Sequence, residues 1–172
     1  MQRVRGTVAH RLIKGRPGRE TRRMSDWWTA PEGVRVLPDG GWRVGGFAIA
    51  HEPSLRYLKA RLVFEEDGAF LVEGSERVPV VVEGPPFEVT AFHLDEEAGE
   101  VHMALDDGSE ERLADDALSL SAETGRFECL VRRGLARAVL SRGAHQLLLA
   151  RVEEAEGLFV LRVGARRIPI RT

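Results

Sequence analysis

The chain has one cysteine, two lysines, no asparagine and no long apolar run. One thiol can form neither an internal disulfide nor a cysteine-based zinc site, so we expect Cys129 to be a core thiol in a reducing, cytoplasmic compartment. No segment approaches the ~20 apolar residues that cross a bilayer, which predicts no membrane partner. The 172 residues suffice for one domain or for two small halves that share a core.

The scarcity of lysine and amides coincides with many charged residues, which make up 30% of the chain. Thermophilic proteins have compositions of this kind, in which arginine and glutamate replace thermolabile side chains. The composition therefore predicts a thermophilic protein.

Opposite charges are segregated along the chain. Residues 1–23 hold eight Lys or Arg against one Glu, whereas residues 64–123 hold two Lys or Arg against eighteen Asp or Glu. A basic tail can bind nucleic acid, but this one has no aromatic side chain to stack on bases. We interpret residues 1–26 as a basic N-terminal extension and do not expect nucleic acid as a partner.

One segment near the middle of the chain returns near its end. GAFLVEGSERVPV begins at Gly68, and GLFVLRVGARRIPI begins at Gly157. With one extra residue at Val163, the two segments match at five pairs of positions: Gly68 and Gly157, Phe70 and Phe159, Gly74 and Gly164, Arg77 and Arg167, and Pro79 and Pro169. The match predicts an internal duplication.

Turn residues and the spacing of apolar residues predict the strands and helices of each half. Asp39-Gly40 between residues 34–37 and 42–44 predicts a hairpin, and apolar spacing predicts helices over residues 52–63 and 134–151, the second kinked at 141–143. Residues 87–94 and 100–105 predict another hairpin. The fold class is therefore α+β, with two similar hairpin-helix-hairpin halves, residues 27–86 and 87–172, built on antiparallel sheets.

No residue pattern indicates catalysis or a metal. The five histidines occur singly, although His93 and His102 are placed to face each other across a hairpin, and no nucleophile motif is present. We therefore expect no enzyme activity, no metal and no cofactor.

Arginines are the most informative polar group. Arg56 lies on the first predicted helix, and Arg132, Arg133, Arg137 and Arg142 lie around the second. Converging guanidinium groups bind phosphates and carboxylates. The alternative is a solvated surface whose arginines pair with the acidic middle segment.

Two stretches resemble the bacterial family DUF1285, a domain of unknown function. The first contains DGGWRVGGFAI, LRYLKARLVFEEDG and FLVEGSERVPVVVEGPPF, and the second contains VRRGL and VGARRIPI. The resemblance implies a duplicated α+β core whose C-terminal half superficially resembles a pleckstrin-homology domain. It also implies a nucleotide-like ligand bound between the halves, with a role in signal transduction. The positions that carry over to ligand binding are Trp42, Arg56, Glu76, Arg77 and Arg132.

Two functional hypotheses follow. The first is a non-catalytic protein that holds an anionic, nucleotide-like molecule between its halves, with Arg56, Arg77 and Arg132 converging on one cleft. The second is a protein-protein interaction module that captures a partner segment on an exposed strand edge.

Overall fold

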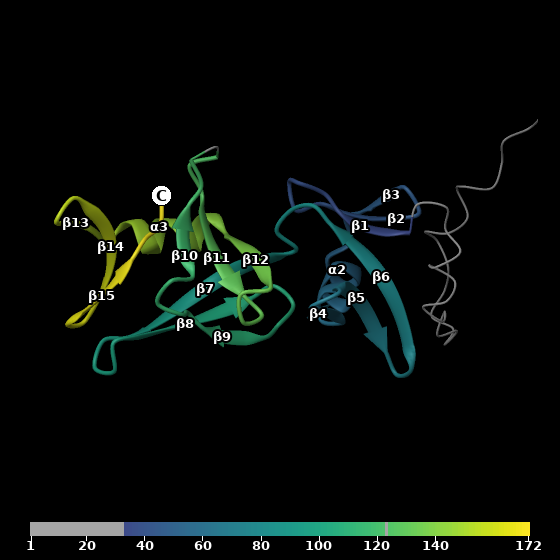
Figure 1. Ribbon diagram of the computed structural model, residues 1–172, viewed down its shortest axis with the longest axis horizontal. Coiled ribbons are helices and arrows are strands. Elements are labelled where there is room, and N and C mark those ends of the chain that lie inside the picture. The colour runs from purple at the N-terminus through teal and green to yellow at the C-terminus, as the bar shows by residue number, and fades with distance from the viewer. Residues whose placement is uncertain (1–32, 123) are drawn as a thin grey trace, which may run out of the picture.

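The structure is a computed structural model that describes residues 33–122 and 124–172. The first half, with sheet A, lies at one end of the long axis in Figure 1, and the second half, with sheets B and C, lies at the other. The N-terminal extension predicted for residues 1–26, together with Trp27 and Trp28, lies outside the described residues. No helix in the described part of the chain is long and apolar enough to cross a membrane.

Sheet A has six strands in the order β3-β2-β1-β6-β5-β4. Its pairs are antiparallel except for β1 with β6, which run parallel. Helix α2 (Glu52–Lys59) joins β3 to β4. The strands are β1 (Val34–Val36), β2 (Trp42–Val44), β3 (Phe47–Ile49), β4 (Leu62–Glu65), β5 (Gly68–Glu73) and β6 (Glu76–Val82).

Sheet B has the order β10-β11-β12-β7-β8-β9, and its single parallel pair is β12 with β7. Its strands are β7 (Phe87–Asp95), β8 (Glu100–Leu105), β9 (Glu110–Arg112), β10 (Leu118–Leu120), β11 (Phe127–Val131) and β12 (Ala136–Leu140). Helix α3 (Arg142–Leu149) then leads into sheet C, an antiparallel meander. Its strands are β13 (Val152–Ala155), β14 (Leu158–Val163) and β15 (Arg166–Pro169).

The predicted duplication is present. The elements β1-β2-β3-α2-β4-β5-β6 recur in the same order as β10-β11-β12-α3-β13-β14-β15, and the helices begin 90 residues apart, at Glu52 and Arg142. The parallel pairing of Arg35 with Val81 has its counterpart in an isolated parallel bridge between Ser119 and Arg171. Strands β7, β8 and β9 precede the second copy of the unit. The α+β class with antiparallel-rich sheets is confirmed, whereas the boundary at residue 86 and the pleckstrin-homology likeness stay predictions.

The sequence alignment of the repeat was wrong over part of its length. Strand β5 begins at Gly68 and the equivalent strand β14 begins at Leu158, which is 90 residues later. Gly68 therefore corresponds to Leu158, and no extra residue is needed at Val163. The pairs Gly74 with Gly164 and Pro79 with Pro169 keep this spacing and are correct. The shared glycine at residue 157 instead occupies the turn before β14, where its φ is +80°.

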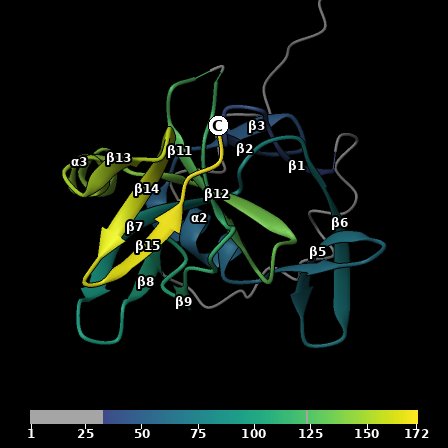
Figure 2. The ribbon, with the colours of Figure 1, turned by 60° about the vertical axis from the view of Figure 1, so that its left-hand side comes forward.

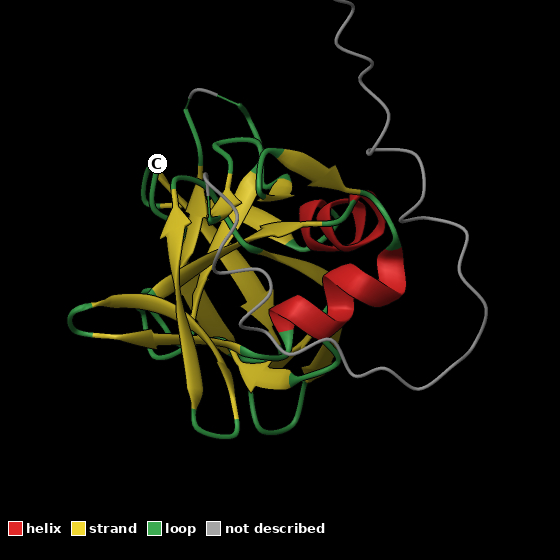
Figure 3. Ribbon diagram, turned by 90° about the vertical axis from the view of Figure 1, so that its right-hand side faces the viewer, coloured by secondary structure: helices red, strands yellow, loops and turns green. Residues whose placement is uncertain are grey.

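The helix predictions were too long. Residues 136–140 form β12, and its alternate residues Ala136, Ala138 and Leu140 lie in the core. Leu135, just before the strand, is 52% exposed. Helix α3 begins only after Ser141, whose hydroxyl accepts the Ala144 N–H as an N-cap. The first helix ends at Lys59, because the chain turns there and the next residues form β4. Both helices lie on one side of the molecule (Figure 3).

The core is continuous across both halves. Leu58 and Leu71 of the first half and Phe87, Leu140 and Leu148 of the second are each at most 1% exposed. Cys129 is 1% exposed, as expected of a core thiol, and burial raises the pKa of its thiol to about 12. The connection from β6 to β7 is also packed, since a Cβ on Gly84 would lie 2.3 Å from the Leu37 carbonyl oxygen.

Sheet C is held to sheet B through the turn between β14 and β15, which lies beside the β7-β8 hairpin in Figure 2. The Glu96 carboxylate accepts hydrogen bonds from Arg151 and from the Gly164 N–H, and these bonds lower the pKa of Glu96. A Cβ on Gly164 would lie 2.0 Å from the Glu96 carbonyl oxygen. Gly74, the equivalent glycine of the first half, has open space around it.

Substitution of these two glycines separates the effect of the contact between sheet C and Glu96 from the effect of backbone strain. Both have positive φ, +57° at Gly164 and +59° at Gly74, so Gly74→Ala should cost about 1 kcal/mol of unfolding free energy. Gly164→Ala should cost about 1–3 kcal/mol more, because its methyl group overlaps the Glu96 backbone. Chemical denaturation measures both variants, and equal losses would show that the contact with Glu96 is not tight.

Candidate functional site

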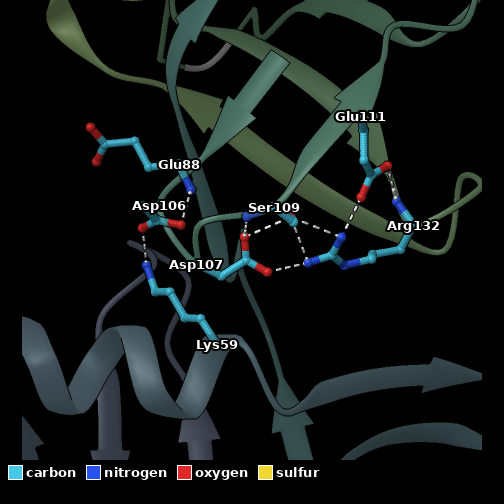
Figure 4. A network of polar contacts seen from close by, with 7 residues as sticks. All are labelled: Lys59, Glu88, Asp106, Asp107, Ser109, Glu111 and Arg132. Carbon is cyan, nitrogen blue, oxygen red and sulfur yellow. Dashed lines mark hydrogen bonds and ion pairs between the residues drawn. The ribbon is translucent and has the colours of Figure 1, made fainter. Parts of the chain in front are cut away.

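The two halves meet at the turn between β8 and β9, residues 106–109, shown in Figure 4. Asp106 forms an ion pair with Lys59 of α2, and its other carboxylate oxygen accepts the Glu88 N–H at 3.0 Å. Lys59 is only 9% exposed, so this ion pair is largely shielded from water. The turn therefore fastens the helix of the first half to sheet B of the second.

The next residue of the turn, Asp107, is bonded to the second half. Its side chain is 3% exposed and pairs with Arg132, while its other oxygen accepts the Ser109 N–H at 2.9 Å and the Ser109 hydroxyl at 2.7 Å. Arg132 also pairs with Glu111, and its guanidinium lies 4.7 Å from the centre of the Phe87 ring. The Arg132 guanidinium thus fastens the turn to the second half.

A cavity of about 750 Å³ opens beside this turn. We call it the interface pocket, because one wall is α2 of the first half and the other is formed by β7, β8 and the turn of the second. It is lined by Glu52, Pro53, Leu55, Arg56, Lys59, Glu88, Thr90, Leu105, Asp106 and Gly108.

Arg56 is the free cation of the interface pocket. It is exposed, and its side chain forms no ion pair or hydrogen bond with any residue that the structure describes. Its guanidinium lies against the turn, since a Cβ on Gly108 would be 2.5 Å from Arg56 Nη2. A glycine at this position gives the guanidinium room, and with a φ of +93° it also suits the turn.

Helix α2 is held in place on its own sheet by a second polar network. Tyr57 donates to Glu73 of β5 at 2.5 Å, and Arg61 donates to the same carboxylate at 3.1 Å. The hydrogen bond from Tyr57 is the main cause that lowers the pKa of Glu73, while burial raises the pKa of Tyr57. The network fixes the helix that carries Arg56 and Lys59.

A second cavity, of about 440 Å³, also lies between the halves. Strands β4, β5 and β6 form one wall and the β11-β12 hairpin forms the other. Its lining is mainly apolar, with Phe64, Val80 and Leu130 among the contributors, and its charged side chains are mostly glutamates. The one arginine of this lining, Arg137, pairs with Glu128, so the cavity offers an anion no unpaired cation.

The structure brings together two of the five predicted site residues. Arg56 and Arg132 both contact the turn at residues 106–109, Arg56 from the pocket side and Arg132 through Asp107 and Ser109. Trp42 lies in the core, 2% exposed, with its indole N–H directed at the Pro86 carbonyl at 3.4 Å.

The other two predicted residues lie on β6 of sheet A. Arg77 stacks over the Phe70 ring at 3.6 Å and pairs with Glu65 at 2.8 Å, contacts that are all within the β4-β5-β6 meander. Glu76 opposes Glu73 where β5 and β6 meet. Arg77 and Arg132 therefore share no partner in the described part of the chain.

Much of the basic surface pairs with the acidic middle segment, as the alternative interpretation of the arginines expected. Arg132 pairs with Asp107 and Glu111, and the same segment receives Arg151 at Glu96 and Arg166 at Asp115. Arg137 pairs with Glu128 at 3.4 Å, while Arg133 and Arg142 have no ion pair with described residues.

The one serine-histidine pair with a hydrogen bond, among the described residues, has a structural explanation. His51 Nδ1 and Ser54 Oγ lie 2.9 Å apart at the start of α2, where the equivalent of His51 in the other half is the N-cap Ser141. The pair therefore links the N-cap residue to the first turn of the helix. His93 and His102 are cross-strand neighbours, as the sequence suggested, but no group of three potential metal ligands occurs in the described part of the chain.

Sequence reasoning missed Lys59 and Asp106, which join the halves, and Asp107, which bonds the same turn to Arg132. Two signals were available. Lys59 is one of only two lysines, and Asp106-Asp107-Gly108-Ser109 is a turn sequence with two adjacent aspartates. Neither signal names a partner, because the ion pairs join residues 47 and 25 positions apart.

Two solved structures are similar to this chain. One is a DUF1285 family protein from Silicibacter pomeroyi DSS-3, with a TM-score of 0.63, 22% identity and coverage of 81% of this chain and 79% of that one. The other is a DUF1285 family protein from Shewanella baltica OS155, with a TM-score of 0.52, 18% identity and coverage of 68% and 90%. The chain has the fold of DUF1285 family proteins.

The DUF1285 resemblance seen in the sequence is thus confirmed at the level of the fold. Comparison with protein-family models and with curated proteins finds no match. The two DUF1285 structures are described by family alone, so they attach no ligand or reaction to this architecture.

Replacing Arg132 should reveal how much the turn depends on it. Arg132→Met keeps an apolar side chain over Phe87 but leaves the buried Asp107 carboxylate without its cation, which should cost about 3 kcal/mol of unfolding free energy. Arg112→Ala is the matched control, because this exposed arginine pairs with Glu100 at the surface and should cost less than about 1 kcal/mol. Similar losses in urea denaturation would contradict a structural role for Arg132.

Proposed function

We propose that this protein binds an anionic, nucleotide-like small molecule in the interface pocket and performs no chemistry on it. One observation carries the proposal: Arg56 is an exposed guanidinium without a partner among the described residues, and it lines a cavity between the two halves. Arginine recognises phosphate through paired N–H groups, and ligand sites favour clefts between structural units.

The remaining groups of the pocket favour a ligand that is more than a simple anion. Lys59 and Asp106 neutralise each other, so the remaining charged groups of the lining are Arg56, Glu52 and Glu88. A nucleotide has both kinds of group, because its phosphate can accept from Arg56 while the N–H groups of its base can donate to Glu88. Leu55 and Leu105 add apolar surface for the flat base. The volume of about 750 Å³ lies within the usual range for such ligands, roughly 300–1,000 Å³.

Each predicted arginine has a different part in this proposal. Arg56 contacts the ligand, and Arg132 holds the turn that forms the pocket wall. Arg77 is engaged with Glu65 and Phe70 on sheet A, so we give it no contact with the ligand. The signalling role rests on position: a ligand held by α2 and by the β8-β9 turn would change the contact between the halves.

A thermal-shift panel tests the proposal. Adenine and guanine nucleotides, the bare nucleosides and inorganic pyrophosphate are each added to the full-length protein. At 100 times the dissociation constant a bound nucleotide should stabilise the fold by about 2.7 kcal/mol, which is a shift of roughly 5–10 °C for a chain of this size. Nucleosides and pyrophosphate should give smaller shifts, because each supplies only part of the recognised chemistry.

Arg56→Ala should weaken nucleotide binding roughly tenfold or more, through loss of a hydrogen bond to a charged group. Arg142→Ala is the matched control, since Arg142 is also an exposed helical arginine without an ion pair in the described part of the chain. Calorimetric titration compares the two variants. No shift with any nucleotide, or equal affinity of Arg56→Ala and the unmodified protein, would contradict the proposal.

A further inference from the structure

The duplication leaves one strand edge different between the two halves. In the second half the outer edge of β12 is bonded to β7, which runs parallel to it with Ala138 opposite Phe87 and Leu140 opposite Val89. In the first half, β3 is the last strand of sheet A, and no strand of the described residues pairs with its outer edge.

Strands β3 and β12 occupy equivalent places. Both are the third strand of an antiparallel meander that leads into the helix, and both have their inner edge on the middle strand of that meander. The inward-facing pair Val44 with Phe47 corresponds to Cys129 with Ala138. The outward-facing pair Arg43 with Ala48 corresponds to Glu128 with Val139.

The exposed fractions of equivalent residues show that the inward-facing residues of β12, which pairs with β7, are buried, whereas those of β3 are not. Ala138 and Leu140, covered by β7, are 0% and 1% exposed, whereas Phe47 at the position of Ala138 is 70% exposed. The edge of β3 has a large apolar side chain and no charged residue or proline of its own, so it lacks two of the usual protections against strand addition. The edge of β3 is therefore suited to pair with another strand.

We propose that β3 binds an extended segment of a partner protein, in parallel orientation, with the pattern apolar-acidic-apolar. The pattern follows from β7, whose residues opposite β12 are Phe87, Glu88 and Val89. On β3 the two apolar side chains of the segment would cover the inward face at Phe47 and Ile49. The acidic side chain would project on the opposite face, next to Ala48.

Charge complementarity selects the acidic middle residue. Arg43 lies directly opposite Ala48 on the neighbouring strand, is exposed, and has no ion pair with any described residue. Because Ala48 is small, the long side chain of Arg43 can reach across it toward an acidic group on the next strand. The second half has Glu128 at the place of Arg43, so this preference belongs to the first half alone.

The strand that covers β12 supplies the probe. A synthetic peptide of residues 85–91, PPFEVTA, is titrated into the isotope-labelled full-length protein, and backbone amide shifts are followed by NMR. Shifts should be concentrated on residues 47–51. Replacing the peptide's glutamate by lysine, or making Phe47→Ser or Arg43→Ser in the protein, should each weaken binding by roughly fivefold, the upper range for one cross-strand pair.

Phe159→Ser is the matched control, because Phe159 is a 45% exposed strand phenylalanine of sheet C. It should leave the affinity for the peptide unchanged. The proposal is overturned if the peptide produces no shifts at β3 at millimolar concentration, if the lysine peptide binds equally well, or if the shifts occur at another edge. Sedimentation that shows a dimer through β3 would also overturn it, because the occupant would then be a second copy of the chain.

Discussion

The structure depends on two adjacent carboxylates that face opposite ways. Asp106 pairs with Lys59 of the first half, and Asp107, which is almost fully buried, pairs with Arg132 of the second. A buried carboxylate without a cation and hydrogen bonds destabilises the folded state. Charged Asp107 therefore requires its bonds with Arg132 and Ser109. The turn that they hold is both the join between the halves and a wall of the interface pocket. Ligand binding and the stability of the interface are therefore expected to be linked.

Duplication gives two units of the same topology, and their differences determine what each can do. Position 59 of the first unit is a lysine that reaches Asp106, whereas the equivalent residue of the second is Leu149, which is 51% exposed. Gly74 is open, whereas Gly164 packs against Glu96. The outer edge of β12 pairs with β7, whereas no described strand pairs with the outer edge of β3. The first unit thus contacts sheet B through helix α2, while the second contacts it through the turn between β14 and β15.

Local sequence signals predicted the hairpins but not the tertiary pairing. Asp39-Gly40 identified the β1-β2 turn because an Asp-Gly pair strongly favours one backbone geometry. The helix predicted over residues 134–151 began too early, because the segment 135–140 fits either period and only its pairing with β11 and β7 makes it a strand. The sequence predicted a site between the halves that contains Arg56, but it did not predict the wall formed by Lys59 and Asp106. Arg56 was selected for its charge, but Lys59 and Asp106 meet only because the fold places α2 against the β8-β9 turn.

A double-mutant cycle between Lys59→Met and Asp106→Asn tests most directly whether this turn holds the halves together. Unfolding free energies are measured for the unmodified chain, both single variants and the double variant. The shielded ion pair predicts a coupling energy of about 1–3 kcal/mol between the two positions. A coupling energy near zero would contradict the account, because the halves would then be joined by apolar packing alone and the turn would have no special part in the interface.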